Sequence, residues 1–211
     1  MDGVNTFALG DETPKGEIKS LCIFSGSRVG QNGRFQEAAV RLGEMMAERG
    51  IRMVYGGGNI GLMGLAATAV LQNGGQVVGV IPEFLMSLEV GNPGVTELVV
   101  VETMHERKAK MYELSDGFVV LPGGLGTLDE TLEIATWKQL QLHAKPIVTL
   151  NIDGFWDPLS GLLDHVVAGG FAHPDMPRLI SSVDTVDDVL DAISNAPAPD
   201  RRVLLSHIDG D

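Results

Sequence analysis

The sequence predicts an α/β fold, a Rossmann-like doubly wound parallel sheet in three layers (α/β/α) that forms a single domain. Short apolar runs of strand length alternate along the chain with longer segments of helical periodicity. Most of the short runs are apolar at every position, which is typical of strands buried on both faces of a parallel sheet. With 211 residues, 44% of them hydrophobic, the chain is long enough to fill one core.

The expected strands are rich in β-branched and other apolar side chains and are bounded by Gly, Pro or charged residues. Pro82 and Pro146 mark two of these boundaries. In chain order, strands are expected over residues 20–24, 51–55, 76–81, 97–101, 117–121 and 147–150, with a further short apolar run at 179–180.

The expected helices carry apolar residues at three- and four-residue spacing. The second of them is rich in small residues and ends at a Gly-Gly pair, which is a helix stop signal. Helices are expected over residues 33–49, 65–72, 104–115, 128–143, 158–167 and 186–195. Residues 83–96 contain glycines and a proline, and we expect an irregular loop there, close to a site.

The two ends of the chain fall outside this pattern, so the Rossmann-like domain is expected to span residues 18–195. Residues 1–17 are polar and are expected to form a loose N-terminal arm. They lack the basic and apolar regions of a signal peptide. Residues 196–211 are charged and contain Pro, as expected for a C-terminal tail.

Composition disfavours several kinds of partner. The net charge is −13 and the pI about 4.7, which argues against nucleic acid and anionic membrane surfaces. The sequence contains no run of ~18 apolar residues, the length that is needed to span a membrane. Cys22 is the single cysteine, so an internal disulfide is excluded and a reducing compartment, the cytoplasm, is expected. Cys22 lies in an expected strand and is interpreted as an inert core residue.

Three expected strands end in glycine-rich turns, at residues 25–30, 56–64 and 122–126. The carboxyl ends of parallel strands share one rim of the sheet, where ligands of such folds bind. A glycine turn followed by the start of a helix presents N–H groups to an anion, usually a phosphate. Glu130, one turn into the helix after the third turn, is either a capping acid favoured by the helix dipole or a group facing the rest of the ligand.

Other patterns are less specific. Gly56-x-Gly58-x-x-Gly61 has the spacing of a dinucleotide motif, but it follows the second strand, and a mononucleotide phosphate fits the short turns better. Arg107 and Lys108 lie on a helix of alternating charge, which is either a solvated face or part of the site. The five histidines lack zinc-site spacing and no Gly-x-Ser-x-Gly elbow is present, so we expect neither a metal nor a cofactor.

The helix after Thr127 is also expected to take part in assembly. At 100° per residue, Glu130, Ile134 and Trp137 lie roughly opposite the face that should pack on the sheet, which would place Glu130 where a subunit seam meets the glycine rim. A homodimer that buries this outer face is the simplest explanation for two large apolar residues there. The face expected to meet the sheet consists of Leu128, Leu132, Ala135 and Leu142.

These motifs together resemble the Lonely Guy (LOG) family of cytokinin riboside 5′-monophosphate phosphoribohydrolases. Pro122-Gly123-Gly124-x-Gly126-Thr127-x-x-Glu130 is similar to the PGGxGTxxE signature of the family. The family's second glycine motif and its basic helix are matched, in the same order, by residues 55–64 and 104–108. The resemblance covers about residues 19–195. Position 125, often aromatic in plant members, is Leu here.

The resemblance implies a Rossmann-like fold, a homodimer and hydrolysis of the N-glycosidic bond of a nucleoside 5′-monophosphate such as AMP. It also implies a catalytic pair at Arg107 and Glu130. Some relatives carry the label lysine decarboxylase, but no pattern in the sequence indicates a pyridoxal-phosphate site. With the glycine turns included, the expected substrate-binding residues are Ser25, Gly26, Gly57, Gly58, Glu89, Lys108, Gly123, Gly124, Leu125, Gly126, Thr127 and Thr136.

The chemistry of the reaction agrees with this assignment. Breaking the C1′–N bond builds positive charge on the ribose, which a fixed carboxylate such as Glu130 stabilises. Arg107 is better suited to orienting Glu130 or the sugar than to donating a proton, because arginine scarcely deprotonates. The alternative is a nucleotide-binding or carrier protein without catalysis on the same fold. Such a protein has no evident use for Glu130.

Overall fold

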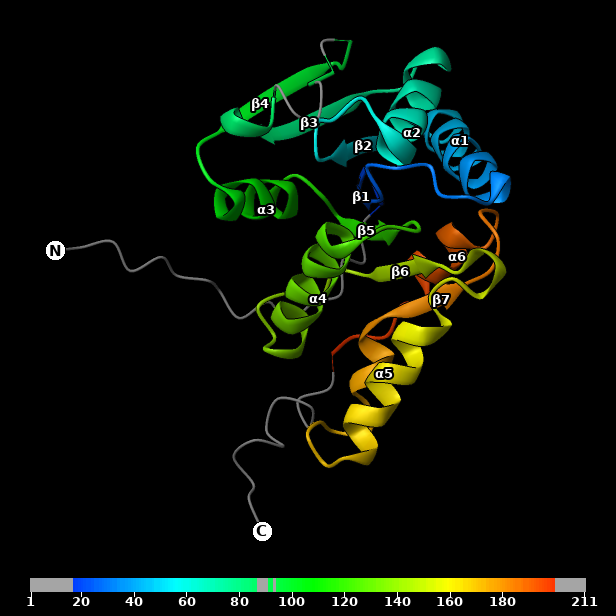
Figure 1. Ribbon diagram of the computed structural model, residues 1–211, viewed down its shortest axis with the longest axis vertical. Coiled ribbons are helices and arrows are strands. Elements are labelled where there is room, and N and C mark those ends of the chain that lie inside the picture. Colours follow the sequence, from blue (N-terminus) through cyan, green and yellow to red (C-terminus); the bar gives the residue numbers. More distant parts are fainter. Residues whose placement is uncertain (1–16, 87–90, 93, 200–211) are drawn as a thin grey trace, which may run out of the picture.

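The structure is a computed structural model that describes residues 17–199 except 87–90 and 93. It contains a seven-stranded sheet in which all paired strands are parallel (Figure 1). The predicted fold class is therefore confirmed. The expected arm, apart from residue 17, and residues 200–211 of the expected tail lie outside the described residues. The strands are β1 (Ser20–Phe24), β2 (Arg52–Tyr55), β3 (Val77–Pro82), β4 (Glu97–Val101), β5 (Gly117–Val120), β6 (Ile147–Leu150) and β7 (Ser181–Val183).

Strand order places the three glycine turns side by side. The order is β4-β3-β2-β1-β5-β6-β7, so the chain winds outward from β1 to one edge and then returns to pair β5 with the other side of β1. The direction of winding switches between β1 and β5, where folds of this kind bind ligands. Backbone hydrogen bonds join the turns directly: Gly26 N–H donates to the Pro122 carbonyl at 3.0 Å, and Leu62 N–H to the Gly26 carbonyl at 3.0 Å.

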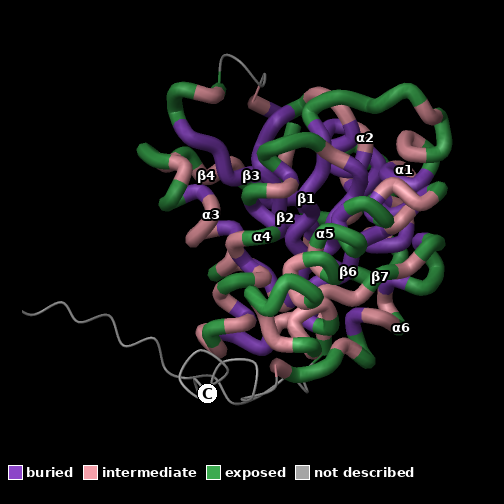
Figure 2. The backbone as a smooth tube through the Cα atoms, turned by 60° about the horizontal axis from the view of Figure 1, so that its bottom comes forward, coloured by how far each residue is buried: buried purple, intermediate pink, exposed green. Residues whose placement is uncertain are grey.

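Helices cover both faces of the sheet, because side chains alternate between the faces along each strand. Leu21 and Ile23 of β1 belong to a core cluster formed with α1, α2 and α6. Cys22 and Phe24 belong to a second cluster, with α3, α4 and α5. Figure 2 shows the buried segments concentrated in the strands between these layers. The helices are α1 (Gly33–Glu48), α2 (Gly61–Gln72), α3 (Met104–Glu113), α4 (Leu125–Gln139), α5 (Asp157–Ala168) and α6 (Val189–Ser194), with 3-10 turns at Glu83–Leu85, Ile152–Gly154 and Met176–Leu179.

Two elements differ from the prediction. Helix α2 begins at Gly61, four residues earlier than expected, so two glycines assigned to the turn are helical. The short strand β7, Ser181–Val183, was not predicted. Its three residues are mostly polar and only partly buried, since β7 is the last strand in the sheet order and pairs on one side, with β6.

The predicted orientation of α4 is right for Leu128 and Ala135, which pack against the core, and wrong for the residues assigned to the outer face. Ile134 is 2% exposed and lies in the core, and Trp137 packs edge-to-face on Tyr112 with ring centroids 5.5 Å apart. Leu132, expected to meet the sheet, is 39% exposed. The inward face contains polar residues that need no solvent; for example, Thr131 Oγ1 donates to the Thr127 carbonyl at 2.6 Å. An apolar stripe therefore does not mark the buried face of this helix.

His143 is buried as a neutral imidazole between α4 and β6. Its Nε2–H donates to the Ile134 carbonyl at 2.9 Å, and its Nδ1 accepts the Lys145 N–H at 3.1 Å. Burial, opposed in part by the bond to Ile134 and assisted by the charges of Lys138 and Lys145, lowers the pKa of His143 to about 4. The folded protein therefore resists protonation at a position where the unfolded chain accepts a proton.

We expect the free energy of unfolding to fall as the pH is lowered from about 6.5 to about 4, since only the unfolded state binds this proton in that window. The contribution of His143 is about 3 kcal/mol, because each pKa unit is worth about 1.4 kcal/mol. Urea unfolding of wild type and His143→Gln at several pH values isolates it. The Gln amide keeps a donor for the Ile134 carbonyl. The difference in free energy of unfolding between wild type and His143→Gln should therefore shrink toward pH 4. A constant difference across the window would contradict the assignment.

Candidate active site

The site is built around the open N-terminus of α4. Gly124 is the N-cap, and the first helical bond runs from Leu128 N–H to the Gly124 carbonyl at 3.0 Å. The preceding amides, at Leu125, Gly126 and Thr127, have no acceptor within the helix. Gly124 and Gly126 are exposed, and a Cβ built on either would meet nothing within 4 Å. The amides of this turn are therefore accessible to an anion.

Ser25, directly after β1, adds an independent sign of a ligand. Its side chain is 7% exposed, and Oγ has no hydrogen-bond partner among the described residues. A buried hydroxyl without a partner is unfavourable and calls for an explanation. Ser25 lines the same cavity as Gly124, Gly126 and Thr127, so a ligand oxygen in that cavity is a suitable partner.

This cavity, which we call the Glu130 cavity, has a volume of about 230 Å³. It combines a polar and an apolar part. Arg107, Asp129 and Glu130 contribute charge, whereas apolar surface comes from Met63, Leu85 and Met104. The sequence did not single out these three apolar residues as ligand contacts, because nothing distinguishes them from core residues before the fold is known.

Arg107 is buried and held by the ends of two strands. Its Nε donates to the Val80 carbonyl at 3.1 Å and its Nη2 to the Gly56 carbonyl at 2.8 Å. The residue is 4% exposed and Glu130 is 9% exposed, so both charges are shielded from water.

Burial, followed by the charge of Glu130, raises the pKa of the Cys22 thiol well above its usual value, consistent with an inert core cysteine.

Gly56 makes room for the Arg107 guanidinium. A Cβ at this position would collide with Nη2, the end of a flexible side chain, so the guanidinium would move while the fold remains. We expect Gly56→Ala to lower kcat/KM on AMP, the kind of substrate that the resemblance implies, about 10- to 100-fold, since displacement of a positioned group by ~1 Å has effects of this size. The matched control is Gly161→Ala on α5, where a Cβ meets nothing within 4 Å. Equal activity of both variants would contradict this role for Gly56.

Lys108 points to α4 rather than into the cavity. Its Nζ lies 3.1 Å from Asp129 Oδ2 and 3.1 Å from Glu133 Oε2. Partial burial lowers the pKa of Lys108, but hydrogen bonds to Glu133 and Asp129 outweigh this and leave the pKa above its ordinary value. Lys108 thereby joins α3, which carries Arg107, to α4, which carries Glu130.

The remaining predicted contacts are distributed around the site. Gly57 and Gly58 belong to the second turn but line neither the Glu130 cavity nor a second, larger cavity of about 610 Å³ that adjoins it. Thr136 is exposed three turns along α4, and its Oγ1 donates to the Leu132 carbonyl at 2.7 Å. Glu89 lies outside the described residues. Residues that the structure brings together at the two cavities are Ser25, Gly26, Gly123, Gly124, Leu125, Gly126, Thr127, Arg107 and Glu130.

The described part of the chain contains no group of three or more His, Cys, Asp or Glu side chains placed to hold a metal ion. Of the helices within residues 17–199, apart from the gaps, none combines the length and the hydropathy needed to cross a membrane.

A doubly wound parallel sheet with an open helix N-terminus and a buried carboxylate at its switch point defines a Rossmann-like protein with an anion site. Comparison with known proteins agrees with this class. A family model described as "Possible lysine decarboxylase" matches residues 63–193. The cytokinin riboside 5′-monophosphate phosphoribohydrolase LOG of Oryza sativa subsp. japonica is 47% identical over 83% of this chain and 73% of its own length.

A second relative, the cytokinin riboside 5′-monophosphate phosphoribohydrolase LOG3 of Arabidopsis thaliana, is 42% identical over 91% of this chain and 90% of its own length. The chain belongs to the LOG family. Among solved structures, the Moco carrier protein of Chlamydomonas reinhardtii has a TM-score of 0.65 at 19% identity, covering 85% of this chain and 98% of that chain. This likeness shows a shared fold.

Proposed function

We propose that the protein hydrolyses the N-glycosidic bond of a nucleoside 5′-monophosphate to free base and ribose 5-phosphate. The substrate is AMP or an N6-modified AMP, including cytokinin riboside 5′-monophosphates. The names and the 42–47% identity of the relatives support this activity. The observation that carries it is a buried carboxylate, Glu130, in one cavity with the open N-terminus of α4 and the unpartnered Ser25 hydroxyl.

In the proposed complex, the 5′-phosphate accepts hydrogen bonds from the first amides of α4 and from Ser25 Oγ. The ribose then lies along α4 toward Glu130, and the base contacts the apolar part of the cavity at Met63, Leu85 and Met104. As the C1′–N bond breaks, the Glu130 carboxylate stabilises the cationic ribose and accepts a proton from the attacking water. Water supplies hydroxide to C1′, Glu130 returns the accepted proton to solvent, and the leaving base takes up one proton from solvent, so that water is the only other reactant consumed.

Arg107 is proposed to orient Glu130 or the sugar, since its guanidinium is anchored on the carbonyls of Val80 and Gly56. Lys108, Thr136, Glu89, Gly57 and Gly58 remain proposed contacts of the ligand. For Lys108 the structure favours an indirect contribution, through the carboxylates of α4.

A pyridoxal-phosphate decarboxylase is not favoured, although the family model carries that label. Such enzymes hold the cofactor through a lysine. Among the described residues, no lysine lines either cavity. The buried Lys138 donates to the Leu179 carbonyl at 3.1 Å instead.

The test is release of free adenine and ribose 5-phosphate from AMP by the purified protein. Stoichiometric binding of AMP without any release of adenine would favour the alternative, a nucleotide carrier. The fold alone does not separate the two, because carrier proteins share it. The compartment we propose is the cytoplasm, which suits the buried thiol of Cys22.

We also propose a homodimer, now on a different face of α4. Leu125 is 85% exposed, Leu132 39% and Leu140 42%, which leaves an apolar stripe on the outer side of the helix. We expect Leu132→Asp to shift sedimentation at micromolar concentration from dimer to monomer, because an interface would have to bury the new charge. Leu162→Asp on α5 is the control at another exposed leucine. A wild-type monomer at this concentration would rule the proposal out.

A further inference from the structure

A second and larger cavity opens beside the Glu130 cavity, and the proposed reaction does not use it. It has a volume of about 610 Å³, against about 230 Å³ for its neighbour. The two share Gly26, Ser27, Gly124 and Leu125, so they meet at the N-terminus of α4, where the phosphate is proposed to bind. Small-molecule sites commonly occupy about 300–1,000 Å³, a range that includes the larger cavity and not the smaller one.

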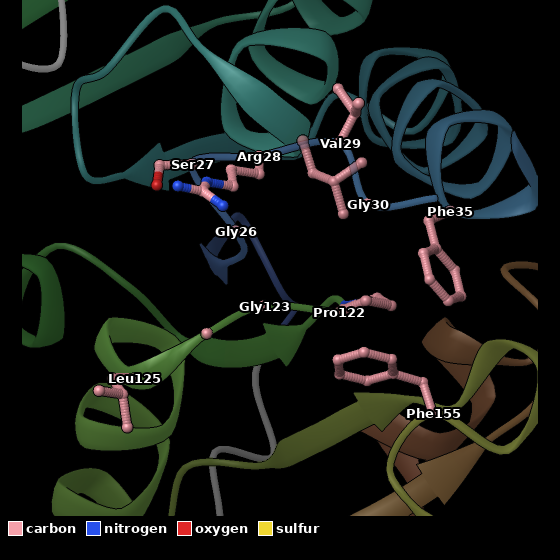
Figure 3. Close-up of a pocket in the computed structure, with 12 residues that line it drawn as sticks. Gly26, Ser27, Arg28, Val29, Gly30, Phe35, Pro122, Gly123, Leu125 and Phe155 are labelled. Atoms are coloured by element: carbon pink, nitrogen blue, oxygen red, sulfur yellow. The ribbon is translucent and has the colours of Figure 1, made fainter. Parts of the chain in front are cut away.

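The lining of this cavity changes from one end to the other (Figure 3). The Arg28 side chain extends toward Ser27 and Gly26, whereas Phe35 and Phe155 lie on the far side, beyond Pro122. The two phenyl rings meet edge-to-face with centroids 5.4 Å apart. Arg28 is exposed, forms no ion pair with any described residue, and is the one charged side chain among the described residues that line the cavity.

Each end favours a particular chemical group. A guanidinium next to a phosphate-binding turn is suited to a second phosphate, which arginine binds through paired N–H groups. Aromatic side chains in an apolar cavity are suited to a planar ring, as in stacking of nucleic-acid bases. From the wall that the two cavities share, a ligand would therefore meet the phosphate-binding turn first, then the Arg28 cation, and last the aromatic surface. A site restricted to monophosphates has no evident use for this continuation.

We propose that this cavity binds the distal half of a nucleoside pyrophosphate, that is, a second aromatic ring linked through a second phosphate. The inference rests on the proposed function, which places the first phosphate at α4. It differs from the dinucleotide hypothesis based on Gly56-x-Gly58-x-x-Gly61, because that motif lines neither cavity. The proposed ligand would instead extend from the turn after β5 to Phe35, near the start of α1.

The test is equilibrium binding by calorimetry in the Glu130→Gln protein, which limits turnover. The probes are AMP, ADP and diadenosine pyrophosphate. We expect diadenosine pyrophosphate to bind about 10-fold more tightly than ADP, the size of one base–aromatic contact. Phe155→Ala should remove this gain and leave the Kd of ADP within about twofold. Arg28→Gln should weaken ADP and diadenosine pyrophosphate, but not AMP.

Phe35→Leu is a second, smaller change on the other wall, should Phe155→Ala not fold. Phe171→Ala is the matched control, because Phe171 is 84% exposed and lines neither cavity. Equal Kd values for ADP and diadenosine pyrophosphate, or a gain that survives both cavity variants, would overturn the inference. Adenine release from AMP by wild-type protein is measured separately. If AMP is hydrolysed but diadenosine pyrophosphate binds no more tightly than ADP, this inference alone is overturned. If diadenosine pyrophosphate binds more tightly but AMP is not hydrolysed, the proposed function alone is overturned.

Discussion

Glu130→Gln is expected to give a folded protein that binds AMP but turns it over at least ~100-fold more slowly, the effect of losing a positioned catalytic group. Glutamine keeps the size of the side chain and part of its hydrogen bonding. It removes the negative charge that faces the cationic ribose in the transition state. Because that charge is buried, with 9% of the residue exposed, water compensates little for its loss.

The measurement is kcat and KM for adenine release from AMP, with AMP affinity determined independently. We expect the loss in kcat, since the ribose is uncharged in the ground state. Asp129→Asn is the matched control. Asp129 is the neighbouring carboxylate on α4, but its side chain is 58% exposed and is paired with Lys108. A kcat of Glu130→Gln close to wild type, or an equal loss in both variants, would refute the role given to Glu130.

Much of this site was accessible from the sequence because it depends on backbone geometry. The glycine turns after β1, β2 and β5 follow short apolar strands, and parallel topology brings such turns to one rim. Glu130 was correctly expected one turn into α4, close to the glycine rim, but it was assigned to the outer face of the helix, whereas it is buried. The apolar contacts Met63, Leu85 and Met104 did not follow, because they come from three separate segments.

The orientation of α4 shows why periodicity failed at the same place. The inner face of α4 buries polar side chains, Thr127, Thr131 and the proposed catalytic residue Glu130. Some leucines of the helix then lie on the outer face, so the apolar stripe does not predict which face of α4 is buried. Conflict between local pattern and fold is expected at functional sites.

Two glycines of the second turn, Gly56 and Gly61, have packing roles that the sequence did not predict. Gly56 leaves space for the Arg107 guanidinium. At Gly61, φ is +64° and a Cβ would collide with the backbone of Ser27, so this glycine lets the turn after β1 pack against α2. A glycine motif therefore does not distinguish contact with a ligand from contact with another part of the chain.

AMP is expected to be a far better substrate than adenosine, with kcat/KM higher by about 10² to 10⁴. Charge-assisted hydrogen bonds contribute on the order of 1.5–3 kcal/mol each, and every 1.36 kcal/mol is a factor of ten. Two or three such bonds, partly replaced by water in adenosine, account for this range. The proposed donors are the first amides of α4 and Ser25 Oγ, which suits a chain of net charge −13.

The assay compares free adenine released from AMP and from adenosine, with a chelator present because we expect hydrolysis to be independent of metal. Ser25→Ala should lower kcat/KM on AMP by about tenfold and leave the slow rate on adenosine unchanged, since it removes one phosphate donor. Ser27→Ala, also at the cavity but exposed, is the matched control. Equal rates on AMP and adenosine would refute the phosphate site, and loss of activity with the chelator would refute a metal-free mechanism.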